Sequence, residues 1–148
     1  MTALDVRMMS AANASGAAIA KGSTLTANVR YIEFTVPGQP IPKARARVVR
    51  GHAFTPETTA GHESVIVAEA RNAGVRGEPD AKAQWEIVCW FYRKGQRRAD
   101  LDNLLKTVLD ALNGVVWADD NQIVAIKAYK RREDKLPRTL IEIREVRE

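Results

Sequence analysis

The stretch from Trp85 to Gly114, WEIVCWFYRKGQRRADLDNLLKTVLDALNG, decides the fold that this sequence predicts. Its first part, WEIVCWFYRK, is aromatic and β-branched and is apolar at successive positions, which is typical of a central strand buried on both faces. Its last part predicts a helix over residues 103–113, because apolar residues recur at helical spacing and Gly114 is a natural stop. Between the two lie Asp100 and Asp102, and Asp102 is the predicted N-cap residue.

Weaker patterns on either side complete one domain. In residues 31–36 apolar Ile32, Phe34 and Val36 alternate with the residues between them, which predicts a half-buried strand that ends at Pro37. A helix is predicted from about 56 to 73, and a turn at 119–121 precedes a further strand. The segment RTLIEIREV predicts a final strand. This order of elements favours an α+β fold for residues 29–148, a single domain with two helices packed on a mixed β-sheet.

Residues 1–28 have a different composition from the rest of the 148-residue chain. They are rich in Ala, Ser, Gly, Thr and Asn and contain no aromatic residue. Such a segment buries too little apolar surface to offset the entropy of ordering it. We therefore expect a flexible N-terminal tail here.

The chain is basic, with a net charge of +5 and a pI of about 9.6. This charge favours an anionic partner, nucleic acid before an acidic membrane surface, although a protein that is merely basic stays an alternative. No apolar run approaches the roughly 20 residues that a membrane span needs. Cys89 lies alone in an apolar run and is expected to be a small buried hydrophobe. One cysteine and two histidines argue against a structural zinc site.

A row of cations follows the first predicted strand. In an extended chain Lys43, Arg45 and Arg47 share one face, because side chains repeat every second residue. Such a row suits contacts with a phosphate backbone. An edge strand protected by charge explains it equally well.

The acidic residues around Asp100 allow two interpretations. In the first, Asp102 caps a helix, Lys106 pairs with neighbours four residues away, and Asp119 and Asp120 form a turn. In the second, the carboxylates gather around a cation, because two carboxylates about 4 Å apart repel by about 4 kcal/mol at an effective dielectric constant of about 20. If residues 99–102 are extended, Asp100 and Asp102 point the same way, about 6.6 Å apart. Mg²⁺ suits such an all-oxygen site, and Lys106 would face a phosphate.

The segment DLDNLLKTVLDALNGVVWADDNQ, residues 100–122, resembles the signature of the RusA family of Holliday junction resolvases. Weaker agreement extends over residues 30–148. The resemblance implies a RusA-like fold and a cytoplasmic, Mg²⁺-dependent endonuclease of DNA recombination and repair, from a host or a phage, with no organic cofactor. It implies a homodimer that resolves four-way junction DNA by paired symmetric nicks.

The family's functional residues map onto particular positions of this chain. The catalytic and metal-binding carboxylates correspond to Asp100, Asp102 and Asp120, and the catalytic lysine corresponds to Lys106. Asp119 stays the alternative third ligand, because the interval between the aspartates is one residue shorter here than in the family pattern. Candidates for DNA backbone contacts are Lys43, Arg45, Arg47, Arg93, Lys94, Arg97 and Arg98.

Other functions stay open on the sequence. A non-catalytic accessory protein that binds branched DNA would bind tightly and in a salt-sensitive way without cutting. A nuclease of another kind is a weaker possibility, since the spacing of the acids and the lysine does not fit the restriction-enzyme pattern. A basic α+β domain whose aspartates only cap helices and form turns is the simplest alternative.

Overall fold

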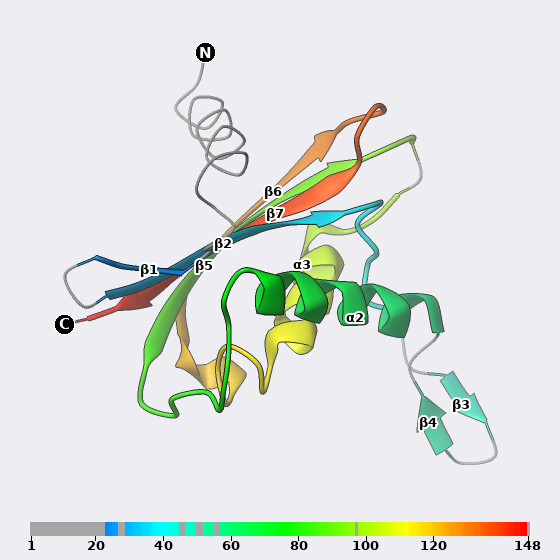
Figure 1. Cartoon of the computed structure of the whole chain (residues 1–148). Helices are drawn as coiled ribbons and strands as arrows, with labels where there is room; N and C mark the ends of the chain where they lie inside the picture. Colours follow the sequence, from blue (N-terminus) through cyan, green and yellow to red (C-terminus); the bar gives the residue numbers. More distant parts are fainter. Residues whose placement is uncertain are drawn as a thin grey trace.

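The computed structural model describes residues 23–26, 29–44, 47–49, 52–54, 57–96 and 98–147 (Figure 1). Its centre is a five-stranded sheet with the order β1-β2-β7-β5-β6. These strands are β1 (Ser23–Thr26), β2 (Val29–Pro37), β5 (Gln84–Arg93), β6 (Ile123–Arg132) and β7 (Arg138–Val146). All neighbours pair antiparallel except β5 and β6, which are parallel. The predicted mixed sheet is therefore confirmed.

The parallel pair β5 and β6 explains the position of the second helix. Two parallel strands need a long crossover connection, and here α3 (Leu101–Leu112) and the short 3₁₀ helix η2 (Asp120–Gln122) supply it. The other helix, α2 (Glu57–Asn72), lies between β4 and β5 in the chain. Both helices lie on the same side of the sheet (Figure 1).

The main core fills the space between the sheet and the two helices. From β5 it takes alternate side chains, including Trp85, Ile87 and Phe91. From the helices it takes Ile66 on α2 and Leu104 on α3, together with their apolar neighbours. Cys89 belongs to this core, and burial raises the pKa of its thiol, so it is the inert buried hydrophobe that the sequence predicted.

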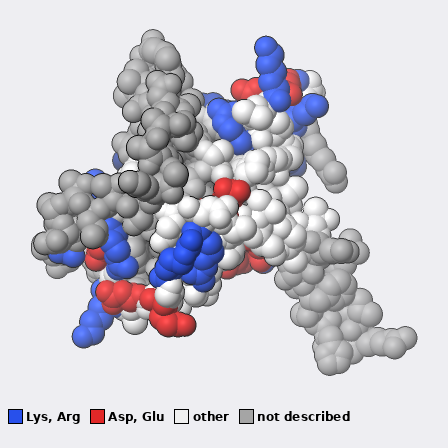
Figure 2. Space-filling model, viewed as in Figure 1, with Lys and Arg blue, Asp and Glu red and all other residues white. Residues whose placement is uncertain are grey.

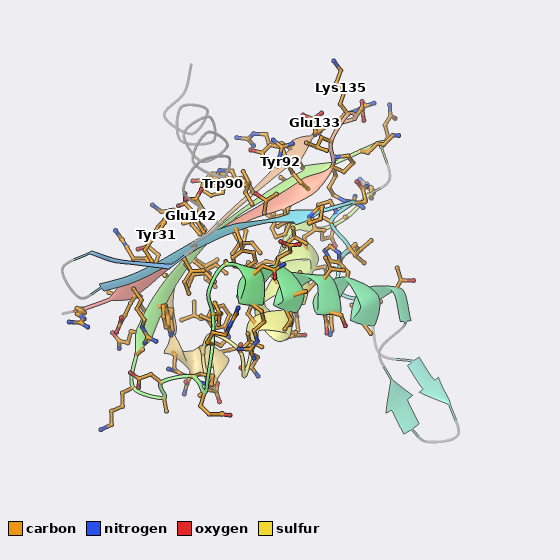
Figure 3. All side chains as sticks on the ribbon, viewed as in Figure 1. Tyr31, Trp90, Tyr92, Glu133, Lys135 and Glu142 are labelled. Atoms are coloured by element: carbon orange, nitrogen blue, oxygen red, sulfur yellow. The ribbon has the colours of Figure 1, made fainter. Side chains whose placement is uncertain are left out.

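The opposite face of β5 is also apolar. Val88, Trp90, Tyr92 and Leu140 form a second buried cluster, and the ring of Tyr129 stacks on Trp90 with 5.9 Å between centroids. Figure 3 shows Trp90 and Tyr92 on the side of the sheet away from the helices. The two clusters account for the apolar run of β5, which is an internal strand as predicted, although β7 is the middle one.

The start of α3 differs from the prediction. Asp100, with an extended backbone (φ −74°, ψ 137°), is the N-cap residue, and Asp102 lies inside the first turn. The helix begins earlier than predicted, at Leu101, whose side chain packs against the main core. The predicted stop is correct, since Gly114 follows the helix with a φ of +80°.

Three short strands were not predicted. Strands β3 (Arg47–Val49) and β4 (His52–Phe54) pair into a small antiparallel sheet of their own, within the segment where we expected an extended basic row. Strand β1 pairs with β2 inside the segment that we assigned to a tail. Residues 1–22 lie outside the described residues, so the tail itself stays a prediction.

Candidate active site

The first two predicted acids lie at the N-terminus of α3. Asp100 is exposed, and its side chain makes no capping hydrogen bond. Asp102 is also exposed, and its Oδ1 accepts a hydrogen bond of 2.9 Å from the backbone N–H of Asn103. Residues 99–102 are not extended throughout, because the helix begins at Leu101, so the condition for the spacing of about 6.6 Å between Asp100 and Asp102 is not met. Both carboxylates instead lie at the positive end of the helix dipole, which favours negative charge.

The other two predicted acids lie on η2, and the structure gives them different roles. Asp119 caps η2: its Oδ1 accepts from the backbone N–H of Asn121 at 3.0 Å, and its own N–H donates to Gln122 Oε1 at 3.0 Å. Asp120 is exposed, and its Oδ1 accepts from the indole Nε1–H of Trp117 at 3.1 Å. Among the described residues, no other group donates to the Asp120 carboxylate. Asp119 is therefore the cap of η2 and Asp120 the partner of Trp117, and each exposed carboxylate uses one of its two oxygens in these bonds.

The turn that carries both acids is anchored to the core by Gln122. Its Nε2 donates to the carbonyl oxygens of Asp80 and Ala83 at 2.8 and 2.9 Å. Its Oε1 accepts from the backbone N–H groups of Ala118 and Asp119. Gln122 is only 8% exposed, so these bonds are protected from water. Gln122 thus holds η2 against the start of β5, next to the pairing of Ile123 with Trp85.

The predicted metal ligands have suitable chemistry but do not form a closed cage. Across residues 30–44, 58–96 and 98–147, no three Asp, Glu, His or Cys side chains lie close enough to hold a metal ion together. Mg²⁺ commonly binds through one or two carboxylates, several waters and the phosphates of its substrate. Exposed Asp100 and Asp102, at the start of one helix, fit that kind of open, all-oxygen site, in which waters and the substrate complete the shell.

The predicted lysine belongs to a chain of alternating charges between α2 and α3, which we call the Lys43–Asp110 network. Lys106 Nζ lies 3.2 Å from Asp110 Oδ1, and Lys43 Nζ lies 3.2 Å from Asp110 Oδ2. Lys43 Nζ also lies 2.6 Å from Glu63 Oε1. The Lys106 side chain is 60% exposed, so it is the member that faces solvent. The predicted Lys106–Asp110 pair is therefore present, and no pair between Lys106 and Asp102 forms.

Lys43 is not the free surface cation that we expected. Its side chain is only 20% exposed and its ammonium lies between the carboxylates of Glu63 and Asp110. Burial disfavours the charged form of Lys43, but hydrogen bonds and Coulombic attraction from both carboxylates outweigh burial and raise the pKa. The backbone N–H of Lys43 donates to the carbonyl of Asn103 at 2.8 Å. Lys43 thus ties the segment after β2 to the first turn of α3.

The remaining predicted DNA contacts divide into three groups. Arg93 is buried, at 9% exposure, and its Nε donates to the carbonyl of Pro40, which gives it a structural role in place of the expected surface contact. Lys94 and Arg98 are exposed, as a contact with DNA requires. Arg45, Arg97 and the side chain of Arg47 lie outside the described residues.

The sequence analysis missed a basic group on β6, at the edge of the sheet. It consists of Lys127, Lys130, Arg131 and Arg132, all exposed. Lys130 Nζ donates to the carbonyl of Ala99 at 2.8 Å, which links this group to the residue before Asp100. Figure 2 shows Lys and Arg gathered with acidic residues at the end of the sheet where β6 turns into β7. The signal was present in the sequence as the run KAYKRR, which we interpreted only as part of a strand.

The family model for the endodeoxyribonuclease RusA matches residues 37–144, well over half of the chain. The chain belongs to the RusA family. The matched range includes every predicted catalytic residue and both helices, and the family that this model describes is that of the endodeoxyribonuclease RusA. No curated protein matches the chain.

Solved structures add little to this assignment. A chain of the crystal structure of the HypE–HypF complex is similar at 14% identity with a TM-score of 0.41, over 97% of this chain and 41% of that one. This chain therefore spans less than half of that protein's chain, and a likeness at this level carries no argument. Among the described residues, no helix is long and apolar enough to cross a membrane.

Proposed function

We propose that this RusA-family protein is a Mg²⁺-dependent endonuclease that resolves four-way DNA junctions by paired symmetric nicks. One observation carries the proposal: Asp100 and Asp102 lie exposed at the N-terminus of α3, with Lys106 one helical turn further along the same helix. All three lie in the segment that matches the family. Carboxylates and a cation so close together suit a site for a divalent ion and a phosphate.

In this proposal each side chain has a separate task. Asp100, Asp102 and Asp120 would hold Mg²⁺, with Asp119, whose Oδ1 caps η2, as the alternative third ligand. When bound, Mg²⁺ neutralises charge on the phosphodiester and activates water for its hydrolysis. Lys106 would donate to a non-bridging phosphate oxygen and stabilise the negative charge that develops there. Its ammonium pairs with Asp110, and because the Lys106 side chain is 60% exposed it can also reach a bound strand.

DNA would be held by cations around this site. Lys94 and Arg98 precede α3, and Lys130 on β6 reaches the same segment through its bond to the carbonyl of Ala99. Lys127 and Arg131 lie on the other face of β6, with Tyr129. These side chains suit sequence-independent contacts with phosphates. Symmetric cutting needs two equivalent sites, which a homodimer with two-fold symmetry would supply. A cytoplasmic role in recombination or phage DNA processing follows from the same proposal.

The test is cleavage of a synthetic four-way junction beside a linear duplex of the same sequence, with and without Mg²⁺. The proposal expects two symmetric nicks in the junction, in Mg²⁺ only. Equal cutting of both substrates would contradict junction specificity, and cutting in EDTA would contradict the metal requirement.

A second candidate is a branched-DNA-binding protein that does not cut. It is favoured by the absence, among the described residues, of three clustered metal-ligating side chains. It predicts tight, salt-sensitive binding of the junction and no product with Mg²⁺, Mn²⁺ or any other divalent ion.

A further inference from the structure

Trp117 differs from the two other tryptophans in what its indole N–H contacts. All three side chains are buried, with exposures of 0% for Trp117 and 1% for Trp85 and Trp90. Within the described part of the chain, the indole N–H groups of Trp85 and Trp90 have no hydrogen-bond partner. The indole N–H of Trp117 donates to Asp120 Oδ1 at 3.1 Å. Two tryptophans of this chain are therefore buried without such a bond. The hydrogen bond of Trp117 is thus not a necessary consequence of its burial.

The backbone around Trp117 holds its ring in one place. The carbonyl of Trp117 accepts from the N–H of Gly114 at 2.7 Å, and Trp117 forms an isolated bridge with Asn113. These contacts tie it to the end of α3, while its ring packs in the main core. A hydrogen-bond donor that is fixed in this way can orient its acceptor, because the donor stays in place when the acceptor side chain moves.

Asp120 is held from the other side by η2. The Asp119 cap and the Gln122 anchor fix the backbone of Asp120, and Trp117 fixes one of its two carboxylate oxygens. Asp120 is exposed, so the other oxygen is presented to solvent in a set direction. Partners of this kind orient metal-binding carboxylates and strengthen their binding.

We propose that Trp117 is a positioning residue for Asp120, and that its indole N–H sets the orientation in which Asp120 presents an oxygen to a divalent cation. This inference rests on the proposed function, and it adds a residue outside the set of acids and lysine. Trp117 then has two roles: its ring packs in the core, and its indole N–H orients the Asp120 carboxylate toward the cation.

The first test examines the hydrogen bond without any catalysis. In a ¹H–¹⁵N spectrum of the protein with labelled tryptophans, three indole signals are expected, one for each tryptophan. Asp120→Asn should shift one of them, and Asp119→Asn should leave that signal in place because an asparagine retains the capping oxygen. No shift of any indole signal in Asp120→Asn would overturn the inference, whether or not a Trp117 variant folds.

The second test measures the Mg²⁺ concentration that gives half the maximal rate of junction cleavage. Trp117→Phe keeps a buried ring and removes the N–H, and it should raise this concentration by about tenfold, the lower end of the loss seen for such supporting partners. Much of the rate should return at saturating Mg²⁺. The matched control is Trp85→Phe, which removes the same atoms from the same core but breaks no hydrogen bond.

The outcomes separate the inference from the function on which it rests. An equal increase for Trp117→Phe and Trp85→Phe would overturn the positioning role while leaving the nuclease intact. A native protein that cuts no junction at any Mg²⁺ concentration would overturn the proposed function and, with it, any role of Trp117 in the cation site. The indole shift would then report a hydrogen bond with only a structural role.

Discussion

Lys43 Nζ lies 3.2 Å from Asp110 Oδ2 and joins the segment after β2 to helix α3. The same ammonium contacts Glu63 on α2, so one cation links three parts of the chain. These contacts lie beside the surface from which Lys106 extends, since Asp110 pairs with both lysines. The stability of the helix pair and the placement of the candidate catalytic lysine therefore depend on shared charges.

Lys43→Met should destabilise the protein. The substitution keeps most of the aliphatic volume but leaves the partly buried carboxylates of Glu63 and Asp110 without their shared cation. We expect the free energy of unfolding in urea to fall by about 1.5–3 kcal/mol, the range for hydrogen bonds to charged groups. Lys82→Met, at an exposed lysine without an ion pair among the described residues, is the control. Unchanged stability with weaker DNA binding would instead assign Lys43 to the DNA contact that the sequence suggested.

The contribution of Lys43 should also depend on pH in one direction. Because its pKa is raised in the folded protein, the folded state holds the proton more tightly than the unfolded state does. The difference in unfolding free energy between the native protein and Lys43→Met should stay constant from neutral pH to the ordinary lysine value of 10.5. It should then shrink as the pH rises through the folded pKa. A difference that grows above 10.5 would contradict the Lys43–Asp110 network.

Lys106→Met should separate activity from stability. Lys106 is largely exposed, and its pair with Asp110 spans four residues on one helix, so its loss should change the unfolding free energy by no more than about 0.5 kcal/mol. Junction cleavage at saturating Mg²⁺ should fall by about 10²- to 10³-fold, the usual cost of removing one donor to a transition-state charge. The measurement is a single-turnover rate, with Lys82→Met as control. A rate within a factor of a few of the native protein would exclude Lys106 from the chemistry.

The basic group of β6 should contribute to DNA affinity and not to cleavage once DNA is bound. Lys127 and Arg131 are both exposed. They lie on the same face of β6, because their positions differ by four and side chains on a strand return to the same face at every second position. Replacing each with Gln should reduce the slope of log affinity against log salt by about 0.9 for each phosphate that the variant no longer neutralises. The measurement is junction binding in EDTA at several salt concentrations. A slope that matches the native protein would show that DNA does not cross this face.

The sequence predicts the elements whose patterns are local. The aromatic and β-branched run of β5 and the leucine spacing of α3 each identify an element without reference to the rest of the chain. The start of α3 was wrong because Asp100 and Asp102 are equally good caps, and the packing of Leu101 against a distant core decides between them. Strand β1 was missed because its pairing with β2, and not its own composition, makes it a strand.

The candidate site is predictable only in part for the same reason. The acids and Lys106 are found from their spacing within one short segment. The partners of Lys43 come from two other elements, and nothing local to residues 40–44 indicates that its ammonium is already paired. Asp119 and Asp120 have different hydrogen-bond partners because their carboxylates point in different directions at η2. Two adjacent aspartates look the same in a sequence, so these directions could not be predicted.

The central claim is that the carboxylates at the N-terminus of α3 support metal-dependent cutting of branched DNA. The most direct measurement compares the native protein with Asp102→Asn on one labelled four-way junction, recording binding in EDTA and cleavage in Mg²⁺. Asp102 is exposed, so the variant should fold and bind the junction as tightly as the native protein or more tightly. The account predicts two symmetric nicks from the native protein and none from Asp102→Asn. Native-like cleavage by Asp102→Asn would contradict it.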